Sequence, residues 1–153
     1  MKRVVLEQRL GFAATVSADG TPNLSPKGTT SVLDDEHLLF ADIHSPGTVR
    51  NLERNPAIEL NVVDPIVRKG YRFKGTADVL DTGPVFEQVL ASRRERGAQN
   101  PMRAVALVTV TRALPLISPA YDQGLSEDEM RVIYRRFFEA LWSGRADAVG
   151  KPE

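Results

Sequence analysis

Two short segments of the chain carry residue types that bind anions in proteins. Residues 25–30 read Ser-Pro-Lys-Gly-Thr-Thr, and residues 45–48 read Ser-Pro-Gly-Thr at the start of a helical pattern. A helix N-terminus offers free N–H groups and a partial positive charge, so it favours a phosphate. Lys27 adds a cation to the first segment, while Thr48 and Arg50 add a hydroxyl and a cation to the second. Each segment also fits a plain turn or helix cap, and only their convergence would favour a ligand.

The sequence offers little for other kinds of site. The chain has no cysteine, and its two histidines, His37 and His44, are too few to indicate a zinc site. The patterns of a serine-hydrolase elbow, a dinucleotide-binding turn and a P-loop are all missing. Twenty Lys and Arg balance twenty Asp and Glu, so the basic excess of a nucleic-acid-binding protein is lacking.

The N-terminal segment MKRVVLEQRL has two cations near its start but no apolar stretch of the signal-peptide kind. No run approaches the roughly 18 apolar residues that a membrane helix needs. We therefore expect a cytoplasmic protein that binds neither membrane nor nucleic acid.

The first anion-binding segment lies within a strand that its own residues interrupt. Residues 21–32 read TPNLSPKGTTSV, in which Pro22, Pro26 and Gly28 are poor strand formers. Proline cannot donate to a sheet, and glycine often marks a bulge or a close approach of backbone to a ligand. The segment is therefore either a bulged edge strand or a backbone that turns its amides and Lys27 toward a ligand.

The other elements are read from periodicity and from turn and cap residues. Strands are predicted over 11–17, 22–33, 37–42, 57–63, 70–81 and 103–119, with helices over 45–56 and 84–97. Tight turns between the first three strands predict a meander. Gly75 is expected to break the strand over 70–81. A closed or partly open barrel would solve the edge problem of such a sheet.

A final helix is the clearest element. Ser126 and Glu129 have the spacing of a capping box. Seven side chains then form one apolar face: Met130, Ile133, Tyr134, Phe137, Phe138, Leu141 and Trp142. This face predicts a core or dimer contact. Residues 1–144 are expected to form one domain, followed by a flexible tail over 145–153.

Residues 8–81 resemble the pyridoxamine 5′-phosphate oxidase-like family of FMN-binding split-barrel proteins. The resemblance rests on GFAATVSADGTPNLSPKG, LLFADIHSPGTVRNLERNPAIELNVVD and GYRFKGTADVL in that order, with a weaker similarity in PLISPAYD. It implies a mainly β fold, a six-stranded antiparallel split β-barrel with a few flanking helices. It also implies a homodimer with FMN at the subunit interface.

The same resemblance implies which residues contact the cofactor. Pro46, Gly47 and Thr48 occupy the phosphate positions, and Lys27 or amides near Gly28 would face the N1–C2=O edge and stabilise the reduced flavin. The implied cofactor-binding residues are Ser25, Pro26, Lys27, Gly28, Thr30, Ala41, Asp42, Pro46, Gly47, Thr48, Asn51 and Arg72.

Two departures from the family pattern bear on function. The phosphate turn here has no cation, and the C-terminal Trp and Arg-x-His pattern that recognises pyridoxal phosphate is missing. Vitamin B6 oxidation is therefore not expected. Three hypotheses stay open: an FMN-dependent oxidoreductase acting on a small molecule, a deazaflavin-dependent reductase, or a non-catalytic flavin- or haem-binding module.

Overall fold

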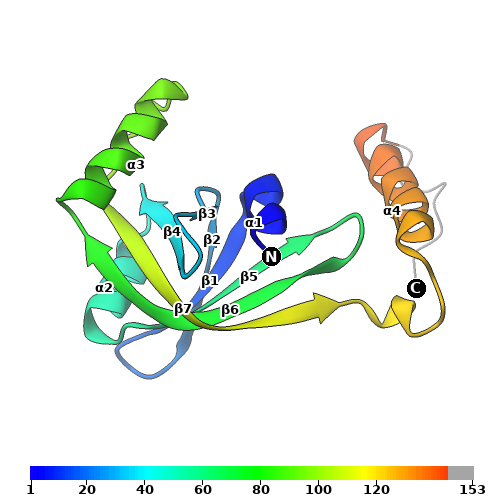
Figure 1. Ribbon diagram of the computed structural model, residues 1–153, viewed down its shortest axis with the longest axis horizontal. Helices are drawn as coiled ribbons and strands as arrows, with labels where there is room; N and C mark the ends of the chain where they lie inside the picture. The colour runs from blue at the N-terminus through cyan, green and yellow to red at the C-terminus, as the bar shows by residue number, and fades with distance from the viewer. Residues whose placement is uncertain (145–153) are drawn as a thin grey trace.

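Seven antiparallel strands form one strongly curled sheet, which wraps into a half-open barrel (Figure 1). The computed structural model describes residues 1–144. The spatial order of the strands is β2-β1-β5-β6-β7-β4-β3. The strands are β1 (Gly11–Val16), β2 (Pro22–Lys27), β3 (Ser31–Val32), β4 (His37–Asp42), β5 (Ala57–Asp64), β6 (Lys69–Leu80) and β7 (Ala104–Ile117). The helices are α1 (Lys2–Gln8), α2 (Pro46–Arg54), α3 (Pro84–Glu95), α4 (Glu127–Trp142) and the 3₁₀ turn η1 (Pro119–Tyr121).

The interrupted strand explains why the sheet has seven strands rather than the predicted six. The stretch over 22–33 breaks at residues 28–30, so that β2 pairs with β1 and β3 pairs with β4. The predicted meander is therefore wrong. Strands β2 and β3 form the two ends of the sheet order although they are consecutive in the chain. The three-residue link between them thus spans the split of the barrel.

Two threonine hydroxyls hold this link in place of strand pairing. The Thr29 Oγ1 accepts the Ala41 N–H at 2.9 Å and lies 3.3 Å from the Ala41 carbonyl oxygen. The buried Thr30 Oγ1 donates to the Lys27 carbonyl at 2.7 Å. Because these bonds engage backbone groups on both sides of the break, they fix the backbone on which Lys27 lies.

The core lies inside the curled sheet and follows the predicted alternation. Along β1, Ala13 and Thr15 face inward and Phe12 and Val16 face outward. The largest fully buried apolar side chains come mostly from β4, β5 and β7: Phe40, Leu60, Val62, Val105 and Val108, with Met130 of α4. The predicted break in β6 is confirmed as an irregularity between Lys74 and Gly75.

Helix α1 was not predicted. Its residue Val5 is fully buried and packs into the core cluster. A seven-residue helix is too short to show a clear period, and tertiary packing supplies its stability. The helix ends at Arg9, a non-glycine residue in the left-handed region with φ 53°.

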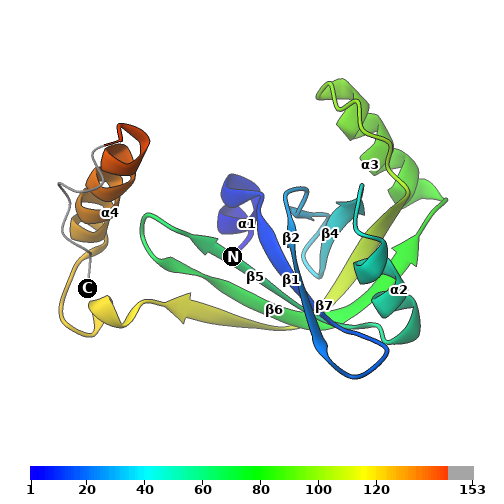
Figure 2. The ribbon, with the colours of Figure 1, turned by 180° about the vertical axis from the view of Figure 1, so that it is seen from behind.

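Helix α4 stands apart from the barrel, beside the turn between β5 and β6 (Figures 1 and 2). Its capping box is confirmed: the Glu129 N–H donates to Ser126 Oγ at 3.3 Å, and the Ser126 N–H donates to Glu129 Oε2 at 2.8 Å. The tail predicted over 145–153 lies outside the described residues. Within the described part of the chain, no helix is long and apolar enough to cross a membrane.

Candidate functional site

The side chain of Lys27 is buried beside the first turn of α2. It is 3% exposed, and its Nζ donates to Ser25 Oγ at 2.9 Å and to Thr48 Oγ1 at 3.2 Å. The Nζ also lies 5.5 Å from the centre of the Phe40 ring. Within residues 1–144, no carboxylate oxygen lies within 4.0 Å of this ammonium group. The two anion-binding segments read from the sequence therefore converge.

A buried ammonium without a carboxylate partner is costly, because two hydroxyl groups replace only part of its hydration. Burial lowers the pKa of Lys27, and the negative charge of Asp42 opposes that change. Asp42 is itself buried, and its Oδ1 accepts the Ser45 N–H at 2.8 Å. An exposed surface position for Lys27 is inconsistent with its burial. The surroundings of Nζ favour an added anion.

The start of α2 offers further donors to the same place. Ser45 is the N-cap residue by position, but its side chain makes no capping bond. Thr48 lies inside the helix and is 3% exposed, so it is not the N-cap residue. Pro46 has no N–H, which leaves the amides of Gly47 and Thr48 as the free donors of the first turn. These amides, the Thr48 hydroxyl and Lys27 form one cluster of positive character.

Two glycines near this cluster are not required by the fold itself. Neither Gly28 nor Gly47 adopts the left-handed conformation, and a Cβ added to either would meet nothing within 4 Å. By contrast, a Cβ at Gly70 or Gly75 would collide with a neighbouring backbone. Glycine is common where a backbone must approach a ligand closely. The open space at both positions fits a bound group there.

Asn51 ties α2 to the sheet. It is 9% exposed, and its Nδ2 donates to the buried Thr15 Oγ1 at 3.1 Å. The same hydroxyl accepts from Asn23 Nδ2 at 3.1 Å. These bonds fix the position of α2, and therefore of Thr48, relative to β1 and β2.

The structure does not bring every implied residue to this cluster. Arg72 lies on the outward face of the sheet, where its Nε is 3.7 Å from Glu59 Oε2. Pro26 is also exposed, opposite Phe12 in the pairing of β1 with β2. Within one subunit, both are separated from the inward-facing Lys27. They could reach the same ligand only across an interface with a second copy.

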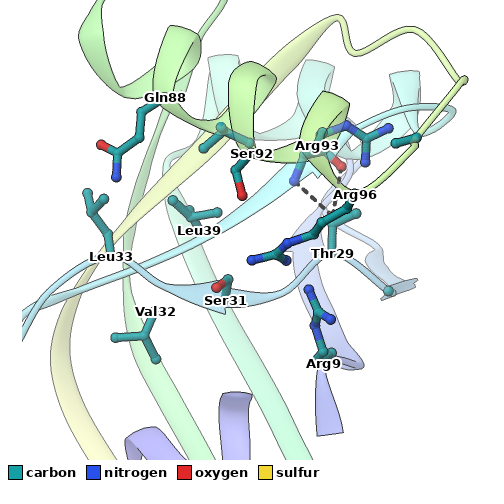
Figure 3. Close-up of a pocket in the computed structure, with 14 residues that line it drawn as sticks. Arg9, Thr29, Ser31, Val32, Leu33, Leu39, Gln88, Ser92, Arg93 and Arg96 are labelled. Carbon is teal, nitrogen blue, oxygen red and sulfur yellow. Dashed lines mark hydrogen bonds between the residues drawn. The ribbon is translucent and has the colours of Figure 1, made fainter. Parts of the chain in front are cut away.

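A cavity of about 300 Å³ lies beside the link between β2 and β3 (Figure 3). Gly28 and Thr29 line it, together with Ala41 and residues of α3. Arg9, Arg93 and Arg96 also line it, and no Asp or Glu is among the lining residues. Such a set favours an anionic occupant, because arginine matches carboxylate and phosphate geometry.

These three arginines were not predicted as site residues. The run SRRERG reads as the polar end of a helix, and Arg9 follows a helix that itself was not predicted. Only the placement of α3 and α1 beside the β2–β3 link brings them together. Their shared charge was visible in the sequence, but their convergence was not.

The histidines do not contribute to a metal site within residues 1–144, where no group of three or more potential metal ligands occurs. His37 lies beside the Asp34 carboxylate, with its Nδ1 2.8 Å from Oδ1. His44 is exposed just before α2.

Comparison with known proteins identifies the family of the chain. Residues 1–116 match the sequence profile described as pyridoxamine 5′-phosphate oxidase. The crystal structure of HupZ from Group A Streptococcus is 33% identical with a TM-score of 0.71, over 77% of this chain and 92% of HupZ. The protein MJ0282 of Methanocaldococcus jannaschii is 35% identical over 80 residues. That match covers 51% of this chain and 53% of MJ0282, so the chain spans about half the length of that curated relative.

Two further solved structures share the fold. One is an FMN-binding protein from Syntrophomonas wolfei, 14% identical with a TM-score of 0.66, over 74% of this chain and 82% of that protein. The other is HutZ, the haem storage protein from Vibrio cholerae, 23% identical with a TM-score of 0.59, over 74% and 89% of the two chains. Since the family profile matches residues 1–116 and HupZ is 33% identical over 77% of the chain, this chain belongs to the pyridoxamine 5′-phosphate oxidase family.

Proposed function

We propose that the protein binds FMN, with the flavin phosphate at the first turn of α2, and acts as an oxidoreductase on a small anionic compound. The observation that carries the proposal is the buried ammonium group of Lys27, which has two hydroxyl partners and no carboxylate within 4.0 Å in residues 1–144. A phosphate with a charge of about −1.5 to −2 would supply the missing partner.

Lys27 is assigned here to the phosphate rather than to the edge of the flavin ring. Its Nζ lies 3.2 Å from Thr48 Oγ1, at a residue that the family resemblance places at the phosphate. The phosphate turn has no cation of its own, and Lys27 supplies one from the neighbouring strand. The free amides of Gly47 and Thr48 complete the set of donors.

The arginine-lined cavity is proposed as the substrate site. Gly28 and Thr29 border it and directly follow Lys27 in the chain, so the β2–β3 link connects the cavity with the proposed cofactor site. When bound, FMN supplies the hydride or electron transfer. The residues of this chain orient the two ligands and neutralise their charge. Arginine is the only titratable residue type among the cavity lining, so we assign no protein residue as a general acid or base.

A second copy of the chain is part of the proposal. Arg72 and Pro26 lie on the outward face of the sheet and could contribute to a flavin only from a partner subunit. A homodimer with two-fold symmetry is also the commonest assembly of soluble proteins.

The test is a titration of the flavin-free protein with FMN and with riboflavin, followed by quenching of flavin fluorescence. We expect FMN to bind at least about tenfold more tightly, since riboflavin lacks the charged group that Lys27 would bind. Equal affinities would contradict the phosphate assignment. Haem or a deazaflavin added in the same way tests the two alternative cofactors, because each has its own absorption spectrum. Preferential binding of either would replace the FMN proposal.

A further inference from the structure

The cavity between the β2–β3 link and α3 is cationic at one end and aliphatic at the other (Figure 3). Arg9, Arg93 and Arg96 lie to the right in the view of Figure 3, whereas Val32 and Leu33 lie to the left. Ligand cavities in proteins typically combine an apolar wall with a few polar groups that fix the orientation of the ligand. The separation of the two kinds of side chain therefore bears on what the cavity can bind.

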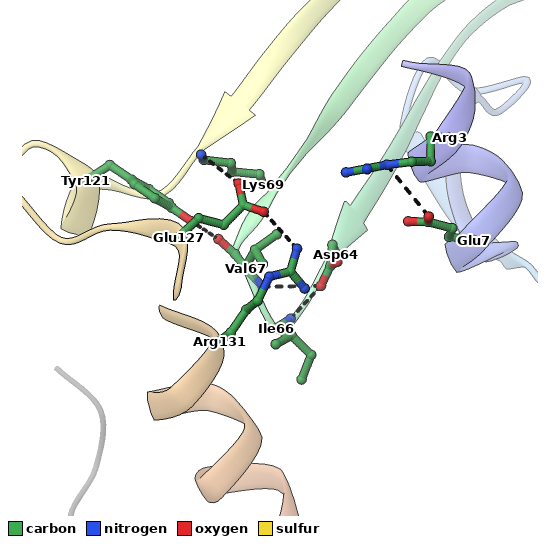
Figure 4. A network of polar contacts seen from close by, with 9 residues as sticks. All are labelled: Arg3, Glu7, Asp64, Ile66, Val67, Lys69, Tyr121, Glu127 and Arg131. Atoms are coloured by element: carbon green, nitrogen blue, oxygen red, sulfur yellow. Dashed lines mark hydrogen bonds and ion pairs between the residues drawn. The ribbon is translucent and has the colours of Figure 1, made fainter. Parts of the chain in front are cut away.

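A second cavity, of about 290 Å³, shows what a cation-lined cavity looks like when the chain neutralises it. It lies between α1, the β5–β6 turn and the start of α4, and three cationic side chains line it. Each has a carboxylate within 4.0 Å: Glu7 for Arg3, and Glu127 for both Lys69 and Arg131 (Figure 4). In residues 1–144, no carboxylate oxygen lies within 4.0 Å of the three arginines of the first cavity. Those arginines are free to bind an anion from solution.

Arg9 has a backbone conformation that arginine seldom adopts. It ends α1 in the left-handed region, with φ 53°, and its N–H donates to the Val5 carbonyl at 3.0 Å. Glycine is the usual residue in this conformation at a helix end, because a side chain there is strained. Strained residues of this kind cluster at ligand sites. Since the side chain of Arg9 lines the cavity, a role in ligand binding would account for the strain.

Arg93 and Arg96 reach the same cavity from the end of α3. Arg93 Nη2 donates to the Asn100 carbonyl at 3.2 Å, so this side chain also fixes the chain that follows the helix. Arg96 directly follows α3 and extends toward Ser31 (Figure 3). Arg9 and Arg96 thus bring two guanidinium groups to one cavity from segments far apart in the chain.

We infer that this cavity binds a small amphipathic anion, an aliphatic chain of a few carbons with one carboxylate or phosphate head group. The head group would lie at Arg9 and Arg96, because the guanidinium fork matches the paired oxygens of both anions. The aliphatic chain would lie against Val32 and Leu33. A volume of about 300 Å³ is at the lower limit of ligand cavities, which restricts the occupant to a small molecule. The inference rests on the substrate site proposed above and names its substrate class.

Four probes titrated into the flavin-free full chain by calorimetry test this class. Hexanoate and hexyl phosphate carry both parts, acetate carries the head group alone, and hexanol carries the chain alone. We expect hexanoate or hexyl phosphate to bind at least about tenfold more tightly than acetate and hexanol, since only the amphipathic probes bury several methylene groups and also pair with arginine. The tighter of the two identifies the head group. Acetate or hexanol binding as tightly as the amphipathic probes, or no binding by any probe, would overturn the inference.

Arg9→Gly separates a ligand-binding role from a structural one. Glycine removes the left-handed strain, so the midpoint of thermal unfolding should be at least as high as in the parent. The variant should nevertheless bind the tighter probe at least about tenfold more weakly, because a hydrogen-bonded ion contact is lost. Arg68→Gly is the matched control, since Arg68 also has a positive φ, at 55°, and does not line this cavity. It should leave probe binding unchanged. Undiminished binding by Arg9→Gly would overturn the role of Arg9.

Arg96→Gln and Lys27→Met distinguish this cavity from the proposed cofactor site. Arg96→Gln should weaken the probe at least about tenfold, whereas Lys27→Met should not. The opposite result would place the anion at Lys27 and overturn the inference. FMN affinity of the unmodified chain is measured separately. Binding of the probe without binding of FMN would leave the cavity assignment standing and contradict the cofactor proposal alone.

Discussion

Lys27 and Lys69 are the same residue type in opposite surroundings. Lys27 is almost completely buried and has two hydroxyl partners, with no carboxylate within 4.0 Å in the described part of the chain. Lys69 is 36% exposed, lies 3.2 Å from the Glu127 carboxylate and sits 4.1 Å from the centre of the Tyr121 ring. The first arrangement costs folding free energy, and the second contributes a little to it.

The difference shows how to separate a ligand site from a structural contact. An exposed, paired lysine needs nothing more, because water and its carboxylate satisfy the charge. A buried lysine without a carboxylate in contact is costly, and an anion from outside the subunit would compensate its charge. Three experiments test whether that compensation is a phosphate.

The largest effect is expected from Lys27→Met, which keeps most of the side-chain length and removes the charge. Loss of a hydrogen-bonded ion contact to phosphate costs about 1.5–3 kcal/mol, or roughly 10- to 150-fold in FMN affinity. The flavin-free variant should be at least as stable as the parent, because a buried charge with no carboxylate in contact has been removed. Fluorescence titration and thermal unfolding measure the two quantities.

Lys69→Met is the matched control. It should leave FMN affinity unchanged and lower the free energy of unfolding by about 1 kcal/mol or less, as for other exposed ion pairs. If both variants lost FMN equally, or if neither did, the distinction between the two lysines would be wrong.

A smaller effect is expected from pH. Burial lowers the pKa of Lys27 below its ordinary value of 10.5, so the free site loses its proton earlier than a solvated lysine would. A bound phosphate would favour the protonated form. FMN affinity should therefore fall as pH rises through the lowered pKa, while riboflavin affinity stays flat. Parallel titrations from neutral to alkaline pH provide the measurement, and a parallel decline for the two flavins would count against Lys27.

Deprotonation of Lys27 affects the stability of the flavin-free protein in the opposite direction to its effect on FMN affinity. Between the lowered pKa and 10.5, the unfolded chain binds more protons at Lys27 than the folded chain does. The contribution of Lys27 to the free energy of unfolding therefore rises with pH over that interval. Subtracting the pH profile of Lys27→Met isolates this contribution.

The smallest effect is expected from Gly47→Ala. A Cβ at this position meets nothing within 4 Å, and the residue lies in the first turn of α2, so alanine should stabilise the fold by about 0.4–1 kcal/mol. The added methyl group would enter the space assigned to the phosphate and weaken FMN binding severalfold. Thermal unfolding and fluorescence titration on one preparation check both. Unchanged FMN affinity in a stabilised variant would contradict the placement of the phosphate at this turn.

Much of the fold could be predicted from the sequence because its signals are local. Alternation along β1, the Pro and Gly residues that bound α2 and α3, and the capping box of α4 depend on neighbours a few residues apart. The break at residues 28–30 was also visible. Which strand each half would join was not, since pairing of β3 with β4 depends on the closure of the whole sheet.

The candidate site could likewise be predicted from the sequence only in part. The sequence by itself determined that two anion-binding segments exist around Lys27 and Thr48, because residue type and turn chemistry are local properties. Tertiary structure alone decided that Lys27 is buried at α2 and that Arg9, Arg93 and Arg96 surround one cavity. Burial and convergence arise from contacts between segments far apart in the chain, where short-range periodicity carries no information. The different surroundings of Lys27 and Lys69 have the same cause, since only tertiary packing determines which of the two side chains stays hydrated.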